Sequence, residues 1–150
     1  LFRSLLGGQY WELKRKTDFM RNMLFLFSHK LTKEQENDAI KSFGIDNFIY
    51  LPEELQNKWS NVDPDLKSLN DYAQDFKKWI DNNSNSNDVV LIIGDYGLCY
   101  ILINHCFTCG LIPVYTTTER KILNEENLDN EKIKINRVIK HNIFRRYENE

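Results

Sequence analysis

The chain has 150 residues, 41% of them hydrophobic and 28% charged, which suits one soluble globular domain with a core of its own. Its formal net charge of −2 argues against a binder of long nucleic acid, because such proteins usually carry a strongly basic face. No apolar run approaches the roughly 20 residues of a membrane span. The odd number of cysteines favours reduced thiols in a cytoplasmic protein.

The first segment of the chain, residues 1–22, differs in pattern from the remaining sequence. It combines a Gly-Gly pair with the basic run at 14–16. We expect an N-terminal extension or linker here and a single domain over 23–150. The alternative is a short helix packed on that domain, which Tyr10 and Trp11 would anchor.

From residue 23 onward, apolar runs alternate with amphipathic segments. The run MLFLF (23–27) is apolar throughout, as is typical of a central parallel strand buried on both faces. Thr32 begins a predicted helix, with Gln35 at capping-box spacing and Gly44 at its end. The segment NFIYLP (47–52) predicts a second strand.

A polar segment then leads to the clearest amphipathic pattern in the sequence. Asp63 is suited to cap a helix and Pro64 to occupy its first position. Apolar residues recur at helical spacing from there to Ile80, so we expect one long helix. The segment DNNSNSND (81–88) has the composition of a loop.

The second half of the chain continues the alternation. VVLIIGD (89–95) predicts a third strand, YGLCYILINHCFTCG (96–110) a helix and LIPVYTTT (111–118) a fourth strand. This order predicts an α/β, Rossmann-like fold whose mostly parallel sheet has flanking helices. INRVIKHNIFRRY (135–147) predicts a C-terminal edge strand or hairpin, antiparallel to RKIL (120–123).

Polar residues follow three of the predicted strands. In open α/β sheets the ligand crevice lies beyond the carboxyl ends of the parallel strands, so we expect these three clusters to converge on one edge. They are Ser28-His29-Lys30, Gly94-Asp95-Tyr96-Gly97 and Thr116-Thr117-Thr118-Glu119-Arg120.

The residue types of these clusters suit a nucleotide. Glycines allow close approach of the backbone, and the N–H groups that open the helices after Thr32 and Gly97 attract anions. Threonine hydroxyls bind ribose or phosphate. Arg120 matches a phosphodiester bidentately, and Lys30 adds a point charge. The Gly-Asp-Tyr-Gly run lacks the GxGxxG fingerprint, so no dinucleotide cofactor is expected.

Each feature also has a purely structural interpretation. The polar residues after the first strand suit an ordinary turn, and Thr32 with Gln35 is explained almost fully by capping. Arg120 is equally able to pair with a neighbouring glutamate. His141 and the arginines at 145–146 are either exposed charges or ligand contacts from an edge or a partner subunit.

The cysteines raise the question of a metal or redox site. Cys106-x-x-Cys109 lies beside His105. The stronger interpretation is a buried helical stripe that includes Cys99, since free cysteine is a common core residue. A fourth ligand is not evident, so no metal is predicted.

The runs LFLFSHKLTKEQ, LIIGDYG and GLIPVYTTTER resemble CRISPR-associated proteins of the Csx series, specifically the group numbered twenty, across about 23–147. These are small stand-alone proteins of type III CRISPR systems. The family is similar to CARF domains, Rossmann-like folds that dimerise and bind cyclic oligoadenylate. The resemblance departs in the first 22 residues and in the cysteine-rich helix.

The resemblance implies a homodimeric, metal-independent ring nuclease with no cofactor, which opens cyclic tetra-adenylate through attack of a ribose 2′-hydroxyl and so switches off type III signalling. The alternative is a sponge or sensor that binds the ring without cutting it. The implied catalytic residues are Arg120 for charge stabilisation, His29 as general base or acid and Ser28 for orientation. The ligand-binding residues that we expect are Lys30, Thr32, Gln35, Gly94, Asp95, Tyr96, Gly97, Thr116, Thr117 and Thr118, with Thr116 at a position where the family usually has a small residue.

Overall fold

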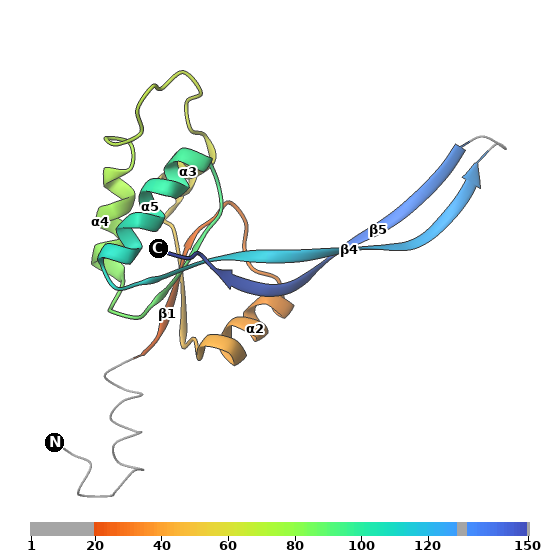
Figure 1. Cartoon of the computed structure of the whole chain (residues 1–150), viewed down its shortest axis with the longest axis horizontal. Helices are drawn as coiled ribbons and strands as arrows, with labels where there is room; N and C mark the ends of the chain where they lie inside the picture. The colour runs from red at the N-terminus through yellow and green to blue at the C-terminus, as the bar shows by residue number, and fades with distance from the viewer. Residues whose placement is uncertain (1–19, 129–131, 150) are drawn as a thin grey trace, which may run out of the picture.

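Five strands form one sheet within the residues that the structure, a computed structural model, describes, namely 20–128 and 132–149, with side chains at 20–120 and 140–149. The sheet order is β2-β1-β3-β4-β5, with β1 to β4 parallel and β5 antiparallel (Figure 1). The predicted α/β fold is therefore confirmed. In chain order the elements are β1 (Asn22–Leu26), α2 (Lys33–Phe43), β2 (Asn47–Tyr50), α3 (Glu53–Ser60), α4 (Gln74–Asn83), β3 (Val89–Ile92), α5 (Tyr96–Thr108), β4 (Ile112–Leu128) and β5 (Lys132–Arg146).

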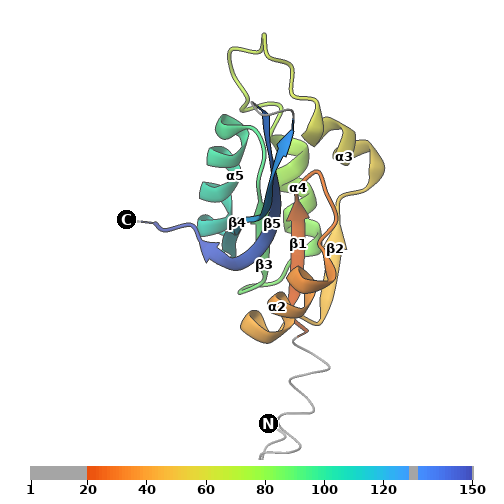
Figure 2. The same cartoon turned by 90° about the vertical axis from the view of Figure 1, so that its right-hand side faces the viewer.

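Helices cover both faces of the sheet. Leu24 and Leu26 of β1 pack in one apolar cluster with residues of α3, α4 and α5. Met23 and Phe25 point to the other face and pack with residues of α2. Figure 2 shows α2 on the opposite side of the sheet from α4 and α5. Because side chains alternate along a strand, this three-layer arrangement buries all of β1, as the apolar run predicted.

Helix α2 has the predicted caps. The Thr32 hydroxyl accepts a hydrogen bond from the Gln35 backbone N–H (3.2 Å), and the Gln35 side-chain oxygen accepts one from the Thr32 backbone N–H (2.9 Å). Gly44 ends the helix with a φ of 65°, a left-handed conformation that glycine adopts without strain. The prediction of this helix and both of its ends is confirmed.

The segment after β2 differs from the prediction. Its polar first part forms α3, whose Trp59 is only 2% exposed. The helix expected from Pro64 begins only at Gln74. The Asp63 carboxylate instead accepts a hydrogen bond from the Asp65 N–H (2.9 Å), a local turn that competes with helix formation. Helix α4 then extends to Asn83, into the predicted loop.

Strands β4 and β5 continue beyond the body of the sheet. Pairing of β4 with β3 ends at Val114, whereas β4 pairs with β5 as far as Leu128 and Lys132. The two strands therefore form an arm, residues 115–128 and 132–145, whose base packs on α2 through His141 and Phe144 and whose remainder extends away from the sheet (Figure 1). The antiparallel C-terminal strand is confirmed, although 120–123 continues the fourth strand rather than forming a separate one.

The amino-terminal boundary is seen only in part. Residues 1–19, most of the predicted extension, lie outside the described residues. Asn22 already belongs to β1, and the Arg21 guanidinium donates to the carbonyls of Phe43 (2.6 Å) and Asn87 (3.0 Å). Among the described helices, none has the length and apolar character needed to span a bilayer.

Candidate functional site

Two of the three polar clusters lie side by side. The sheet order reverses between β1 and β3, and such a switch point is where α/β sheets usually bind ligands. The backbone N–H of Ile93 donates to the carbonyl of Leu26 (3.0 Å), so the two strands end at the same level. The residues at 28–30, the first loop, and those at 94–97, the second loop, therefore begin at adjacent points of one edge.

Helix α3, which the sequence did not reveal, links these two loops. Its Gln56 amide donates to the carbonyl of Phe27 (2.9 Å), and its Trp59 indole N–H donates to the carbonyl of Ile93 (3.1 Å). The Ser60 hydroxyl donates to that of Ser28 (3.2 Å). The crevice expected at the switch point is thus spanned by α3, with a cavity beside each loop.

The cavity beside the first loop is bordered mainly by residues with polar side chains. It has a volume of about 330 Å³ and is lined by Ser28, His29, Lys30, Tyr50, Leu51, Glu53 and Gln56. The three loop residues are exposed, and the His29 ring meets the Phe27 ring edge-on with 5.4 Å between centroids. An imidazole, an ammonium and a carboxylate therefore border one space, a combination suited to proton transfer and to binding an anion.

The cavity beside the second loop is aromatic. It measures about 470 Å³ and is lined mainly by Gly94, Tyr96, Tyr100, Ile103, Phe107 and Tyr147. Tyr96 is 95% exposed and Tyr100 71% exposed, which is unusual for rings of this size. Burial raises the pKa of Tyr147 to about 12, and its hydroxyl donates to the carbonyl of Ile92 (2.7 Å). Exposed ring faces of this kind are typical stacking partners for nucleobases.

Several predicted ligand-binding groups already have partners within the chain. The Asp95 carboxylate accepts a hydrogen bond from the Leu98 N–H (3.0 Å) and so caps α5. Its negative charge occupies the helix end at which we expected an anion. Thr32 and Gln35 cap each other, and the Thr117 hydroxyl bridges the N–H and carbonyl of Ile143 at a bulge in the arm.

The third predicted cluster does not join the other two in the single chain. Neither cavity is lined by any residue of 116–120. Arg120 is exposed and pairs with Ile139 on the arm. At the ~3.3 Å rise of a strand, residues 115–120 carry it roughly 20 Å beyond Val114, the last β4 residue paired with β3. Charge stabilisation by Arg120 in its own chain's crevice is therefore not supported by this geometry.

The C-terminal residues whose role the sequence left open have structural contacts. His141 is buried, and its Nε2 lies 2.7 Å from Asp38 Oδ2 of α2. Burial alone would raise the pKa of Asp38, but hydrogen bonds from Ser42 and His141 lower it below its usual value. The Arg145 guanidinium donates to the Tyr115 hydroxyl (3.0 Å). The interpretation of His141 as an exposed charge is therefore wrong.

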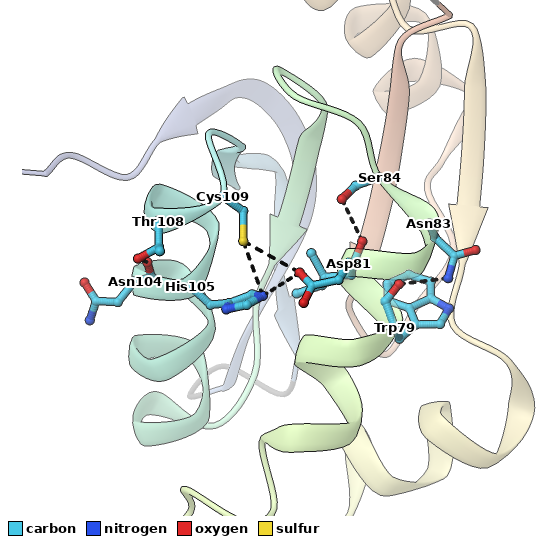
Figure 3. Close-up of polar contacts among 9 residues, drawn as sticks. Trp79, Asp81, Asn83, Ser84, Asn104, His105, Thr108 and Cys109 are labelled. Atoms are coloured by element: carbon cyan, nitrogen blue, oxygen red, sulfur yellow. Dashed lines mark hydrogen bonds and ion pairs between the residues drawn. The ribbon is translucent and has the colours of Figure 1, made fainter.

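A second group of polar residues lies away from both loops. Cys99 and Cys106 are buried as predicted, and burial raises their pKa values to about 11 and about 12. Cys109 is exposed instead, beside His105 and Asp81 (Figure 3). Sequence reasoning missed Asp81 because it assigned 81–88 to a loop. The spacing of His105 and Cys109, one helical turn apart, was the available signal.

Comparison with known proteins gives one consistent result. Residues 21–145 match the model of the family described as "Uncharacterized protein MJ1673 family". The chain is 44% identical over 128 residues to "Uncharacterized protein MJ1673" of Methanocaldococcus jannaschii, an alignment that covers 85% of this chain and 98% of the relative. No solved structure matches it. This protein, with its two strand-end loops and the cavity beside each, therefore belongs to the MJ1673 family.

Proposed function

We propose that this protein binds cyclic tetra-adenylate in the cytoplasm and opens the ring, as the resemblance of its motifs to Csx-series ring nucleases implies. The observation that carries the proposal is the position of the first and second loops, which leave neighbouring strands at the switch point of the sheet. A cavity bordered by polar side chains adjoins the first loop, and a cavity lined by aromatic rings adjoins the second. The aromatic rings suit the base of a nucleotide, and the polar side chains of the first loop suit its ribose and phosphate.

The two cavities bind different parts of the ligand. The exposed rings of Tyr96 and Tyr100 offer stacking surfaces for adenine, a contact typically worth about 1–3 kcal/mol per base. Gly94 and Gly97, at the two ends of the second loop, add no side chain beside the Tyr96 ring. Lys30 in the first loop supplies positive charge for a phosphodiester. The ligand is a compact anion, so it needs no basic face of the kind that long nucleic acid requires.

The proposed reaction is an internal transfer. The ribose 2′-oxygen forms a bond to the adjacent phosphorus while the bond from phosphorus to the 5′-oxygen breaks, leaving a 2′,3′-cyclic phosphate. His29 accepts the proton of the 2′-hydroxyl, and the leaving 5′-oxygen takes up a proton from water. Ser28 orients the ribose, and Lys30 stabilises charge on the phosphoryl oxygens. No step requires a metal ion.

Arg120 contributes to this reaction only in the site of a second chain. Cyclic tetra-adenylate is close to two-fold symmetric, so a C2 homodimer with the ligand across its axis matches it. The arm extends well past its own sheet edge, which gives it the reach to bring Arg120 to a partner's first loop. We therefore assign charge stabilisation by Arg120 to the partner's site.

The test is incubation with cyclic tetra-adenylate in EDTA, with products separated by liquid chromatography. We expect linear products with a cyclic phosphate end. His29→Gln is expected to slow their formation by about 10²–10⁴-fold, the usual contribution of a general base. His105→Gln is the matched control, since His105 lines neither cavity. Intact ligand that fails to co-elute with the protein would refute the proposal.

A binding-only role is the second candidate, and the geometry gives it specific support. Arg120 lies far from both cavities, the Ser28 hydroxyl is bonded to Ser60, and Asp95 caps α5. A protein that holds the ring without productive alignment would return it intact and yet co-elute with it. That result would make the protein a sponge or sensor.

A further inference from the structure

Three potential metal ligands meet between α4 and α5. His105 Nε2 lies 2.8 Å from Asp81 Oδ1 and 3.5 Å from Cys109 Sγ. Cys109 Sγ lies 3.6 Å from the same Asp81 oxygen. Figure 3 shows the three side chains pointing at one another across the gap between the two helices. One nitrogen, one oxygen and one sulfur thus surround a single small space.

The folding of the two helices explains this meeting. His105 and Cys109 are four residues apart on α5, so they share one face of that helix. Asp81 stands next to Ile80 of α4, which packs in the same apolar cluster as Cys106 of α5. The apolar contact between α4 and α5 therefore places the three polar side chains next to one another at the margin of the core. His105 is only partly exposed, while Asp81 and Cys109 reach solvent.

We propose that Asp81, His105 and Cys109 bind one zinc ion, with a fourth position open to water. Zinc bonds of about 2.3 Å to sulfur and about 2.0–2.2 Å to nitrogen and oxygen, at tetrahedral angles, place sulfur about 3.6 Å from each of the other two ligand atoms. Both of the observed distances from sulfur agree with this value. The nitrogen-to-oxygen distance must widen from 2.8 Å to about 3.4 Å, which a rotation of the exposed Asp81 side chain provides.

The donor set selects the metal. A thiolate with an imidazole suits zinc and related transition metals, whereas magnesium and calcium prefer oxygen ligands alone. A Cys-His-Asp catalytic triad is a poor alternative, because both Asp81 and Cys109 contact the same nitrogen, Nε2, of His105. In a triad the carboxylate holds one ring nitrogen and the nucleophile uses the other.

The zinc site lies away from the strand-end loops. The C-terminal turns of α4 and α5 lead into the beginnings of β3 and β4, while the loops follow the ends of β1 and β3. The inferred ion therefore joins two helices near the amino-terminal ends of β3 and β4, whereas the proposed cleavage takes place beyond the carboxyl ends of β1 and β3. It takes no part in that reaction, so either proposal can fail without the other.

The experiment measures zinc binding to the full chain after removal of metal with a chelator. Competition with a chromophoric chelator gives the affinity, and mass spectrometry gives the metal content. We expect one zinc per chain and, with cobalt as substitute, a thiolate-to-metal charge-transfer band. His105→Ala and Cys109→Ala should each weaken binding by at least ~100-fold, since loss of a residue that merely hydrogen-bonds a metal ligand already costs about 10- to 100-fold.

The matched controls are His29→Ala, which removes an exposed histidine at the other edge, and Cys106→Ala, which removes a buried thiol of the same helix. Both should keep wild-type zinc affinity, with folding checked by circular dichroism. Three results would overturn the proposal: no stoichiometric zinc, a cobalt complex without the thiolate band, or equal loss of binding in the controls. Cleavage activity in EDTA does not bear on the zinc site.

Discussion

At Gly94 the backbone passes so close to the Trp59 ring that no side chain fits between them. A Cβ placed there would lie 2.7 Å from the ring. Trp59 has little freedom to retreat, because it is 2% exposed and its indole N–H is bonded to the carbonyl of Ile93. The glycine thus lets α3 pack over the carboxyl ends of β1 and β3, and it lines the cavity beside the second loop.

Gly94→Ala should therefore destabilise the protein by about 1–3 kcal/mol, the usual cost of overpacking a buried contact. Gly97→Ala is the comparison, since its Cβ would lie 3.2 Å from the flexible Leu69 side chain and at an ordinary contact distance of 3.6 Å from the Asp95 carboxylate. Alanine also favours a helix more than glycine does. The expected effect of this substitution is neutral to slightly stabilising. Denaturant unfolding measures both, and equal effects in the two variants would contradict this account of Gly94.

At the scale of elements, the least obvious contact joins α2 to β5. His141 and Asp38 form it from positions far apart in the sequence, and Ser42 donates to the second oxygen of Asp38 (2.6 Å). The pKa of Asp38 is lowered, so its charged form stabilises the fold above the unfolded-state pKa of ~3.9. That stabilisation disappears as the pH falls through the lower pKa of the folded state.

Asp38→Ala should lower the free energy of unfolding by about 1.5–3 kcal/mol at pH 7, the range for hydrogen bonds to a charged group. The difference from wild type should shrink as the pH falls below about 4, because the carboxylate of the wild-type protein then becomes protonated. Urea unfolding at several pH values measures it. Asn37→Ala, an exposed position of the same helix, should change stability by less than ~0.5 kcal/mol. A difference that is constant with pH would exclude the proposed role of the charge.

Some elements of this fold leave a local signal in the sequence, and others do not. The run 23–27, the capping pair Thr32 and Gln35 and the four parallel strands were predictable, because burial and capping leave local signals. Helix α3 was not, since Trp59 is its only buried residue and a mostly polar helix resembles a loop. Asp81 joined His105 and Cys109 only through the packing of two helices, a contact that no local pattern encodes.

At the scale of the whole molecule, the arm decides how the candidate residues can meet. The proposed reaction needs both the first loop and Arg120, yet the fold separates them within a chain. Their positions are reconciled if the arm of one subunit reaches the first loop of its partner. A C2 dimer then contains two composite pairs, each with His29 from one chain and Arg120 from the other.

Mixing two impaired variants tests this arrangement. Arg120→Ala and His29→Gln should each cleave cyclic tetra-adenylate at least ~100-fold more slowly than the wild type. When they are unfolded together and refolded at equal amounts, half of the dimers contain one chain of each kind, and each of these has one intact pair. Roughly a quarter of all His29–Arg120 pairs, and so of wild-type activity, should return if the pairs form between chains. Pairs formed within one chain would give no recovery, because no chain carries both residues. Wild-type recovery when each variant is refolded alone would show instead that neither residue is required.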